Sequence, residues 1–178
     1  MALELWTVVD AKAALGITVS DYDSFITSTL QSIEGFIKSY LGTSALTKQD
    51  ISDETSQNLG CFYATKAYPI HSVSSLTLEG NDILTDDVII GYGNIYYPYG
   101  LNGEIVLSYN AGFDTDDVAY LKSMVLQYLA FELQNLKSGR WGETSRTYAD
   151  GTASWKTPNE YQKDIIEKLN FFRRTILV

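Results

Sequence analysis

The feature that most constrains the fold is a run of apolar side chains, spaced three or four residues apart, in the first quarter of the chain. The run begins after Ser20 and Asp21, either of which can cap a helix, and it ends at Gly42. Its members are Tyr22, Phe25, Ile26, Leu30, Ile33, Ile37, Tyr40 and Leu41. This 3.6-residue period predicts an amphipathic helix over residues 21–41, which must bury one face against other elements.

Three further helices are predicted, over residues 7–16, 115–138 and 159–174. The helix over 115–138 begins with a strongly acidic first turn, and negative charges are favourable at this end because it is the positive end of the helix dipole. Its apolar side chains cover most of its circumference, and this pattern is typical of a helix that is buried on more than one side. We therefore expect it to be the central helix of the fold.

Between the two long helices the pattern changes to that of β-strands. Short runs of strand-forming residues between about 59 and 110 alternate with turn signals, which predicts three to five antiparallel strands. Residues 43–58 are polar and lack a period, so a surface loop is expected there, and residues 139–158 are expected to form a loop or an irregular hairpin. The sequence thus predicts one α+β domain over residues 1–178. It would be mainly α, a helical bundle with a small antiparallel β-element inserted between the long helices.

The chain holds few groups that could perform chemistry. Cys61 and His71 are its only cysteine and its only histidine. They exclude an intramolecular disulfide and argue against a metal site built from thiolates or several imidazoles. We expect His71 to be a turn residue at a strand entrance and Cys61 to be a small buried side chain. No catalytic residue, metal site or cofactor is predicted.

Two groups of acids offer a chemical alternative. The first group consists of Asp114, Asp116 and Asp117. It lacks the glycine and the distant glutamate of a calcium-binding EF-hand loop, so helix capping explains it better. The second group consists of Glu79, Asp86 and Asp87. These residues could supply the paired carboxylates of a carbohydrate- or cell-wall-active hydrolase, although no spacing singles them out from ordinary turn acids. The hypothesis that the chain is such a hydrolase is therefore kept as the alternative from another functional class.

The net charge of −9 is distributed unevenly along the chain. Residues 1–113 hold thirteen acids and four bases, whereas residues 114–178 hold nine of each. This surplus of acids argues against a groove that grips nucleic acid through its phosphates. No apolar run reaches the roughly 20 residues of a membrane span, and the N-terminus lacks the basic and apolar regions of a signal peptide. We therefore expect a soluble protein with no membrane partner.

Two aromatic-rich segments are candidates for protein–protein contacts, in which tyrosine, tryptophan and arginine are enriched. Five of the thirteen tyrosines lie within residues 92–109, and Tyr96, Tyr97 and Tyr99 form the densest group. The second segment combines residues 139–158 with the end of the last helix. Its predicted partner-binding residues are Arg140, Trp141, Arg146, Tyr148, Trp155, Arg173 and Arg174.

Several phrases occur in a recognisable order along most of the chain. They are Leu5-Trp-Thr-Val-Val-Asp-Ala-Lys-Ala-Ala-Leu-Gly-Ile17, the acid pair Asp21 and Asp23, the helix end from Ile33 to Gly42, Tyr68-Pro-Ile-His-Ser-Val-Ser-Ser-Leu-Thr-Leu78, Val106-Leu-Ser-Tyr-Asn-Ala-Gly-Phe113 and Leu169-Asn-Phe-Phe-Arg-Arg174. In this order the chain resembles the head–tail connector (adaptor) proteins of long-tailed bacteriophages. The order of the phrases carries the resemblance, since no single phrase is specific.

The resemblance implies a non-enzymatic virion protein, synthesised in the host cytoplasm and placed at the head–tail interface. Copies would form a ring, commonly a dodecamer, beneath the portal protein. The ring would extend the DNA channel, let DNA pass without sequence-specific binding, and receive a stopper or tail-completion protein. The channel would be lined by the acids of residues 1–113. The portal or neighbouring subunits would be contacted by residues 139–158 and the last helix. A seam between subunits would be formed by Tyr96, Tyr97 and Tyr99. A stopper or tail-completion ring protein of the same particle is the alternative.

Overall fold

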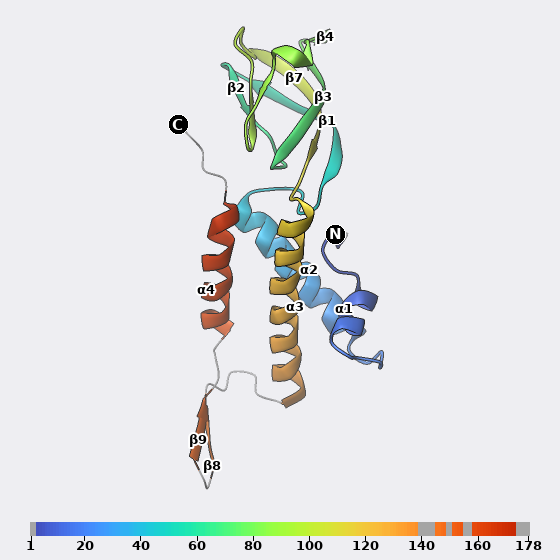
Figure 1. Ribbon diagram of the computed structural model, residues 1–178, viewed down its shortest axis with the longest axis vertical. Helices are drawn as coiled ribbons and strands as arrows, with labels where there is room; N and C mark the ends of the chain where they lie inside the picture. Colours follow the sequence, from blue (N-terminus) through green and yellow to red (C-terminus); the bar gives the residue numbers. More distant parts are fainter. Residues whose placement is uncertain (1–2, 139–144, 149–150, 155–157, 174–178) are drawn as a thin grey trace. The chain divides into compact units, whose positions relative to one another are not determined.

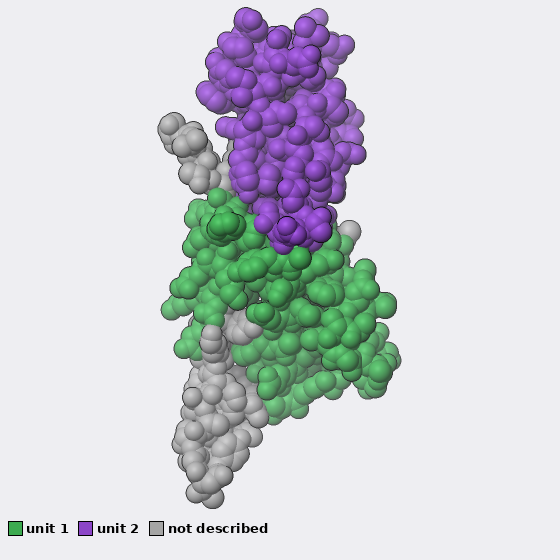
Figure 2. All heavy atoms as spheres, viewed as in Figure 1, with its two compact units in different colours: residues 1–40, 119–173 green, residues 41–118, 174–178 purple. Residues whose placement is uncertain are grey.

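The computed structural model describes residues 3–138, 145–148, 151–154 and 158–173, which fall into two compact units (Figures 1 and 2). The first, called here the helical unit, comprises residues 1–40 and 119–173. Within the described residues, the second, called the β unit, comprises residues 41–118. The chain enters the β unit at the end of one long helix and leaves it in the first turn of the next.

The elements of the helical unit are mostly α-helices. They are α1 (Val8–Ala14), α2 (Asp23–Leu41), α3 (Thr115–Ser138), the hairpin strands β8 (Ser145–Tyr148) and β9 (Gly151–Ser154), α4 (Pro158–Leu169) and the 3-10 turn η2 (Asn170–Phe172). Thr7 caps α1, because its hydroxyl accepts the backbone N–H of Asp10 at 3.1 Å. Such a cap satisfies one of the amide groups that a helix start leaves unpaired.

The core of the helical unit is built from one face of each long helix. The buried side chains are Ile26, Leu30, Ile33 and Ile37 of α2, Leu121, Met124, Val125, Leu129 and Leu133 of α3, and Ile165, Leu169 and Phe172 of α4 and η2. The apolar stripe over residues 21–41 is thus the buried face of α2. On α3 only part of the apolar set is fully buried, since Tyr128 and Phe131 are half-buried and Tyr120 is exposed.

The β unit contains two antiparallel sheets. The larger has the strand order β1-β7-β3-β4, and the smaller has the order β2-β6-β5. The strands are β1 (Gln49–Asn58), β2 (Phe62–Ala64), β3 (Ile70–Leu78), β4 (Asn81–Asp82), β5 (Ile89–Ile90), β6 (Asn94–Tyr96) and β7 (Gly103–Ala111), with a 3-10 turn η1 (Thr85–Asp87) before β5. Strand β7 lies at the centre of the larger sheet, between β1 and β3.

Both sheets contribute to one core. Every second residue of β7 is buried, and these residues join a single apolar cluster that also contains side chains of the smaller sheet. The cluster includes Leu76, Ile105, Leu107 and Tyr109 of the larger sheet, and Tyr63 and Ile95 of the smaller one. Each sheet therefore has an inner face on this core and an outer face directed away from it.

The predicted fold class is wrong. The β region is not a small element within a mainly helical bundle, because it forms a unit with its own core and 26% of the chain is strand. The main cause is β1, which occupies residues that were expected to be a loop. Its side chains are polar and largely exposed because it is an edge strand paired only with β7. Such a strand carries no apolar alternation to reveal it.

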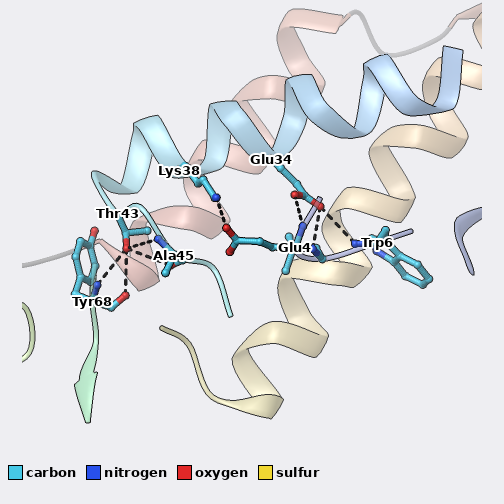
Figure 3. A network of polar contacts seen from close by, with 8 residues as sticks. Glu4, Trp6, Glu34, Lys38, Thr43, Ala45 and Tyr68 are labelled. Atoms are coloured by element: carbon cyan, nitrogen blue, oxygen red, sulfur yellow. Dashed lines mark hydrogen bonds and ion pairs between the residues drawn. The ribbon is translucent and has the colours of Figure 1, made fainter. Parts of the chain in front are cut away.

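The segment between β2 and β3, together with the start of β3, forms hydrogen bonds to both ends of the β unit. On the entry side, the hydroxyl of Thr43 accepts the backbone N–H of Tyr68 at 3.2 Å (Figure 3). On the exit side, the N–H of Gly112 donates to the carbonyl of Pro69 at 2.9 Å, and Nε2 of His71 lies 2.7 Å from the carbonyl oxygen of Gly112. Because that oxygen can only accept, Nε2 carries the proton. His71 is therefore part of the backbone framework of this junction.

Candidate interaction surface

The tyrosines predicted to form a seam lie in β6 and in the loop that follows it. Tyr96 is the last residue of β6 and is half-buried, while Tyr97 packs partly against the core of the β unit. Tyr99 is 79% exposed, and its ring centroid lies 5.3 Å from that of Tyr97 in an edge-to-face arrangement. The structure thus directs Tyr96 and Tyr99 to the surface and uses Tyr97 in part as a core residue.

Tyr96 is the centre of a row of three apolar side chains across the smaller sheet. Phe62 of β2 and Ile89 of β5 are both directly opposite Tyr96 in the strand register. Residues opposite one another in antiparallel strands point to the same face of a sheet, so the three side chains share its outer face. Phe62 and Ile89 are each 61% exposed, and the rings of Phe62 and Tyr96 are 4.7 Å apart. This set is called the outer apolar row below.

More exposed apolar side chains belong to the loops that border the smaller sheet. The N–H of Leu101 donates to the carbonyl of Gly60 at 2.7 Å, so the loop before β2 runs beside the loop after β6. These two loops carry Leu59, which is 92% exposed, and Tyr99. Exposed apolar side chains that gather on one surface of a folded protein mark candidate interaction sites. Sequence reasoning missed Phe62 and Ile89, which become neighbours of Tyr96 only through strand pairing.

The other predicted partner-binding residues are placed only in part. Arg140, Trp141, Trp155 and Arg174 lie outside the described residues, and Arg146 and Tyr148 lie in β8, where only the backbone is described. Arg173 is exposed, and its guanidinium lies 5.7 Å from the ring centroid of Tyr40 in α2. Their contribution to partner binding stays a prediction.

The three candidate catalytic acids, Glu79, Asp86 and Asp87, are all exposed in the described part of the chain. Glu79, in the turn between β3 and β4, accepts the backbone N–H of Glu104 of β7 at 2.6 Å. Asp86 and Asp87 lie in η1. Nowhere among residues 3–138 and the described segments after them do three His, Cys, Asp or Glu side chains gather as metal ligands would. A pocket of about 400 Å³ in the helical unit has only one charged lining residue, Lys137. The other lining residues are Leu15, Ile17, Ala130, Leu133, Gln134 and Ser138.

One buried carboxylate organises the β unit and was not foreseen. Glu54 of β1 is only 5% exposed, and it accepts hydrogen bonds from the hydroxyls of Tyr63 at 2.5 Å and Tyr109 at 2.6 Å. It also accepts the backbone N–H of Lys66 at 3.1 Å. Burial, followed by the bond to Glu54, raises the pKa of both tyrosines above its ordinary value. Both hydroxyls therefore remain protonated donors at neutral pH.

A second buried carboxylate holds the N-terminal segment on the helical unit. Glu34 of α2 is 3% exposed and accepts the backbone N–H groups of Glu4 at 2.9 Å, Leu5 at 3.0 Å and Trp6 at 3.4 Å (Figure 3). The side chain of Glu4 pairs in turn with Lys38. The indole N–H of Trp6 donates to the carbonyl of Lys122 in α3 at 2.9 Å. The N-terminal segment thus ties α2 to α3.

Replacing Glu34 with alanine is expected to release the N-terminal segment while the rest of the chain stays folded. The backbone N–H groups of Glu4 and Leu5 would lose their acceptor, at a cost of about 1–3 kcal/mol. Amide hydrogen exchange should therefore accelerate roughly tenfold or more at residues 4–6. The variant Lys38→Met, which removes only the pair with Glu4, is the control. Unchanged exchange in Glu34→Ala would refute the clamp.

The whole net charge of the chain belongs to the β unit. Residues 41–118 contain eleven of the 22 acids but only two of the thirteen bases, Lys48 and Lys66, for a net charge of −9. The remaining residues hold eleven of each sign and are neutral overall. Nine of the eleven acids are exposed, Asp117 is half-buried, and Glu54 is buried. The β unit therefore presents a strongly acidic surface.

Comparison with solved structures gives full-length similarity to neck components of a gene transfer agent (GTA) particle. A chain from the neck of an empty GTA particle, computed with C6 symmetry, has a TM-score of 0.54 and 14% identity, covering 100% of this chain and 95% of that chain. A chain from the neck of a native GTA particle, computed with C12 symmetry, has a TM-score of 0.53 and 13% identity, with 100% and 98% covered. A chain from the virion of the native particle has a TM-score of 0.51 and 13% identity.

These similarities establish a shared fold over the whole chain. They confirm, at the level of the fold, the resemblance to head–tail connector proteins. No family model matches the chain, and no curated protein sequence matches it significantly. Within the described residues, every helix is too short or too polar to cross a bilayer.

Proposed function

We propose that this chain is a structural virion protein, a head–tail connector in the neck of a phage-like particle. The observation that carries the proposal is the agreement of the complete chain with almost the complete length of neck subunits from another particle. A shared isolated helix pair or β-sheet would not produce mutual coverage of this extent. Both the helical unit and the β unit belong to the shared architecture.

The connector forms a ring of identical copies under the portal protein. The neck structures that it resembles come from particles treated with sixfold and twelvefold symmetry, which supports a cyclic arrangement. A cyclic ring needs only one type of heterologous contact, repeated until the rotation closes. No catalytic step is part of this role, and the function of the chain lies in its surfaces.

The acidic β unit suits a protein that guides DNA without holding it. Exposed carboxylates repel backbone phosphates, so a channel lined by them lets DNA slide without trapping it. In the same ring, the segment 139–158 and the C-terminal helix contact the portal or neighbouring subunits, through the residues named above from Arg140 to Arg174. The opposite end of the ring receives the stopper or tail-completion protein.

The test is the mass and composition of the assembly that contains this chain. A tagged copy recovered from particle-producing cells and weighed by native mass spectrometry should be part of a large symmetric complex with a portal-sized partner. The number of copies follows from multiples of the 19.9 kDa chain mass. Recovery only as a free monomer in cells that contain abundant portal protein would contradict the connector role. Recovery in a ring bound to tail protein but not to the portal would identify a stopper instead.

A further inference from the structure

The smaller sheet of the β unit is apolar on both faces, although only one face is covered by its own core. On the inner face, Tyr63 is 7% exposed and Ile95 is fully buried. On the outer face, Phe62 and Ile89 of the outer apolar row are exposed and Tyr96 between them is half-buried. Antiparallel sheets with one wet face normally carry polar side chains there. The composition of this outer face is therefore that of a surface with a partner.

The same sheet is free of charge within a strongly charged unit. Residues 55–65 and 88–103 contain all three of its strands and no Asp, Glu, Lys or Arg, so all thirteen charged residues of the β unit lie elsewhere. A surface directed at a basic partner would carry some of the eleven acids, as would a surface that repels DNA. The outer face of the smaller sheet fits neither purpose.

An uncharged apolar contact is what two copies of this chain need in order to meet. Each β unit carries a net charge of −9, and close approach of two such units through charged surfaces would be repulsive. Contact through a patch without charges separates the like charges and leaves no ion to be desolvated. A basic partner, by contrast, would gain from contact with the acids and would have no use for a patch that excludes them.

The outer apolar row is also prepared for binding. The rings of Phe62 and Tyr96 already contact one another, and short strands hold both residues, so little side-chain freedom is lost on docking. The larger sheet has its outer face on the other side of the shared core. There a central row of Thr55, Val106 and Thr77 is likewise free of charge. The β unit can thus accept one neighbour on each side, as a ring subunit must.

From these observations we infer that the outer face of the β2-β6-β5 sheet is the seam through which one copy of this chain binds the next copy. The inference rests on the proposed ring-forming function and identifies the surface that closes the ring. Phe62, Tyr96 and Ile89 are its central contacts, and Leu59 and Tyr99 are exposed in the two loops next to the sheet.

The first experiment changes the seam and measures incorporation into particles. In Phe62→Ser/Ile89→Ser, both altered side chains are mainly exposed, so the melting temperature should stay within a few degrees of the wild-type value. Incorporation into purified particles should fall about tenfold or more, because aromatic anchors dominate interface energies. Leu84→Ser is the matched control, since Leu84 is 75% exposed in the same unit but lies outside the smaller sheet. Normal incorporation of the folded double variant would overturn the inference.

The second experiment identifies the occupant of the seam. A photo-reactive benzoylphenylalanine in place of Phe62 should, in assembled particles, give adducts at multiples of the 19.9 kDa chain. Adducts to a different protein would overturn the inference while leaving the connector role intact. Complete absence of the wild-type chain from particles would instead overturn the proposed function. Alkylation of Cys61, which is half-buried beside Phe62, gives an independent readout and should be slower in particles than in the free subunit.

Discussion

Replacing Gly112 with alanine is expected to destabilise the β unit by roughly 3 kcal/mol or more and to lower the melting temperature of the protein by roughly 10 °C. Gly112 has a φ of +125°, a conformation that side chains with a Cβ rarely adopt. A Cβ at this position would lie 2.1 Å from the carbonyl oxygen of Thr47 and 2.7 Å from the amide nitrogen of Lys48. Both neighbours are backbone atoms, so no side-chain rotation can relieve the overlap. Thermal unfolding followed by far-UV circular dichroism measures the effect.

Gly60→Ala separates the steric cost from the conformational one. Gly60 has nearly the same φ, +123°, but an added Cβ would meet no atom within 4 Å. The Gly60 variant therefore carries only the backbone strain, about 1–2 kcal/mol. Equal losses in the two variants would show that the backbone between Thr47 and Gly112 adjusts freely. A much larger loss for Gly112→Ala would confirm that close backbone packing determines the exit from the β unit.

The long helices are the part of the fold that the sequence predicts best. The stripe over residues 21–41 corresponds to α2, and the acidic start and apolar body of residues 115–138 correspond to α3. Both signals are local, because residues three and four apart lie on one face of a helix whatever the rest of the chain does. The spacing of apolar residues therefore predicts a helix even when the elements that pack against it are unknown.

The β unit was underestimated because its decisive contacts are non-local. Strand β1 pairs with β7, and Glu54 of β1 is directly opposite Leu107, more than fifty residues away. In the sequence, Glu54 is one acid in a polar run and reads as a solvated loop residue. Only the pairing brings it to Tyr63 and Tyr109, where two hydroxyls make a buried carboxylate tolerable.

The candidate surface shows the same division between local and non-local information. The cluster of Tyr96, Tyr97 and Tyr99 is visible in the sequence, but the register that adds Phe62 and Ile89 to Tyr96 is not. The distribution of charge is likewise only partly predicted by the sequence. A cut after residue 113 locates the acidic surplus along the chain, whereas the folded structure concentrates it in residues 41–118 of the β unit. Composition thus predicts that an acidic surface exists, and folding decides which unit carries it.

Glu54→Leu is expected to destabilise the β unit by about 3–5 kcal/mol, which makes it the largest single effect predicted for a side chain. The leucine fills most of the space but leaves the hydroxyls of Tyr63 and Tyr109 and the N–H of Lys66 without their acceptor. Each stranded buried donor costs about 1–3 kcal/mol, and relief from desolvation of the carboxylate offsets part of the sum. Urea unfolding followed by far-UV circular dichroism gives the change in free energy.

A double variant that removes both the carboxylate acceptor and one of the hydroxyl donors tests this explanation. Glu54→Leu/Tyr63→Phe deletes the hydroxyl that loses its partner, so it should recover about 1–2 kcal/mol relative to Glu54→Leu alone. Tyr109→Phe is a poorer rescue, because the hydroxyl of Tyr109 also accepts the backbone N–H of Ala67 at 3.1 Å. A single variant as stable as the wild type, or a double variant with no recovery, would mean that packing rather than the carboxylate holds β1 on β7. Recovery would instead show that the hydroxyl of Tyr63, left without its acceptor, accounts for part of the loss, and that the buried carboxylate of Glu54 stabilises the pairing of β1 with β7.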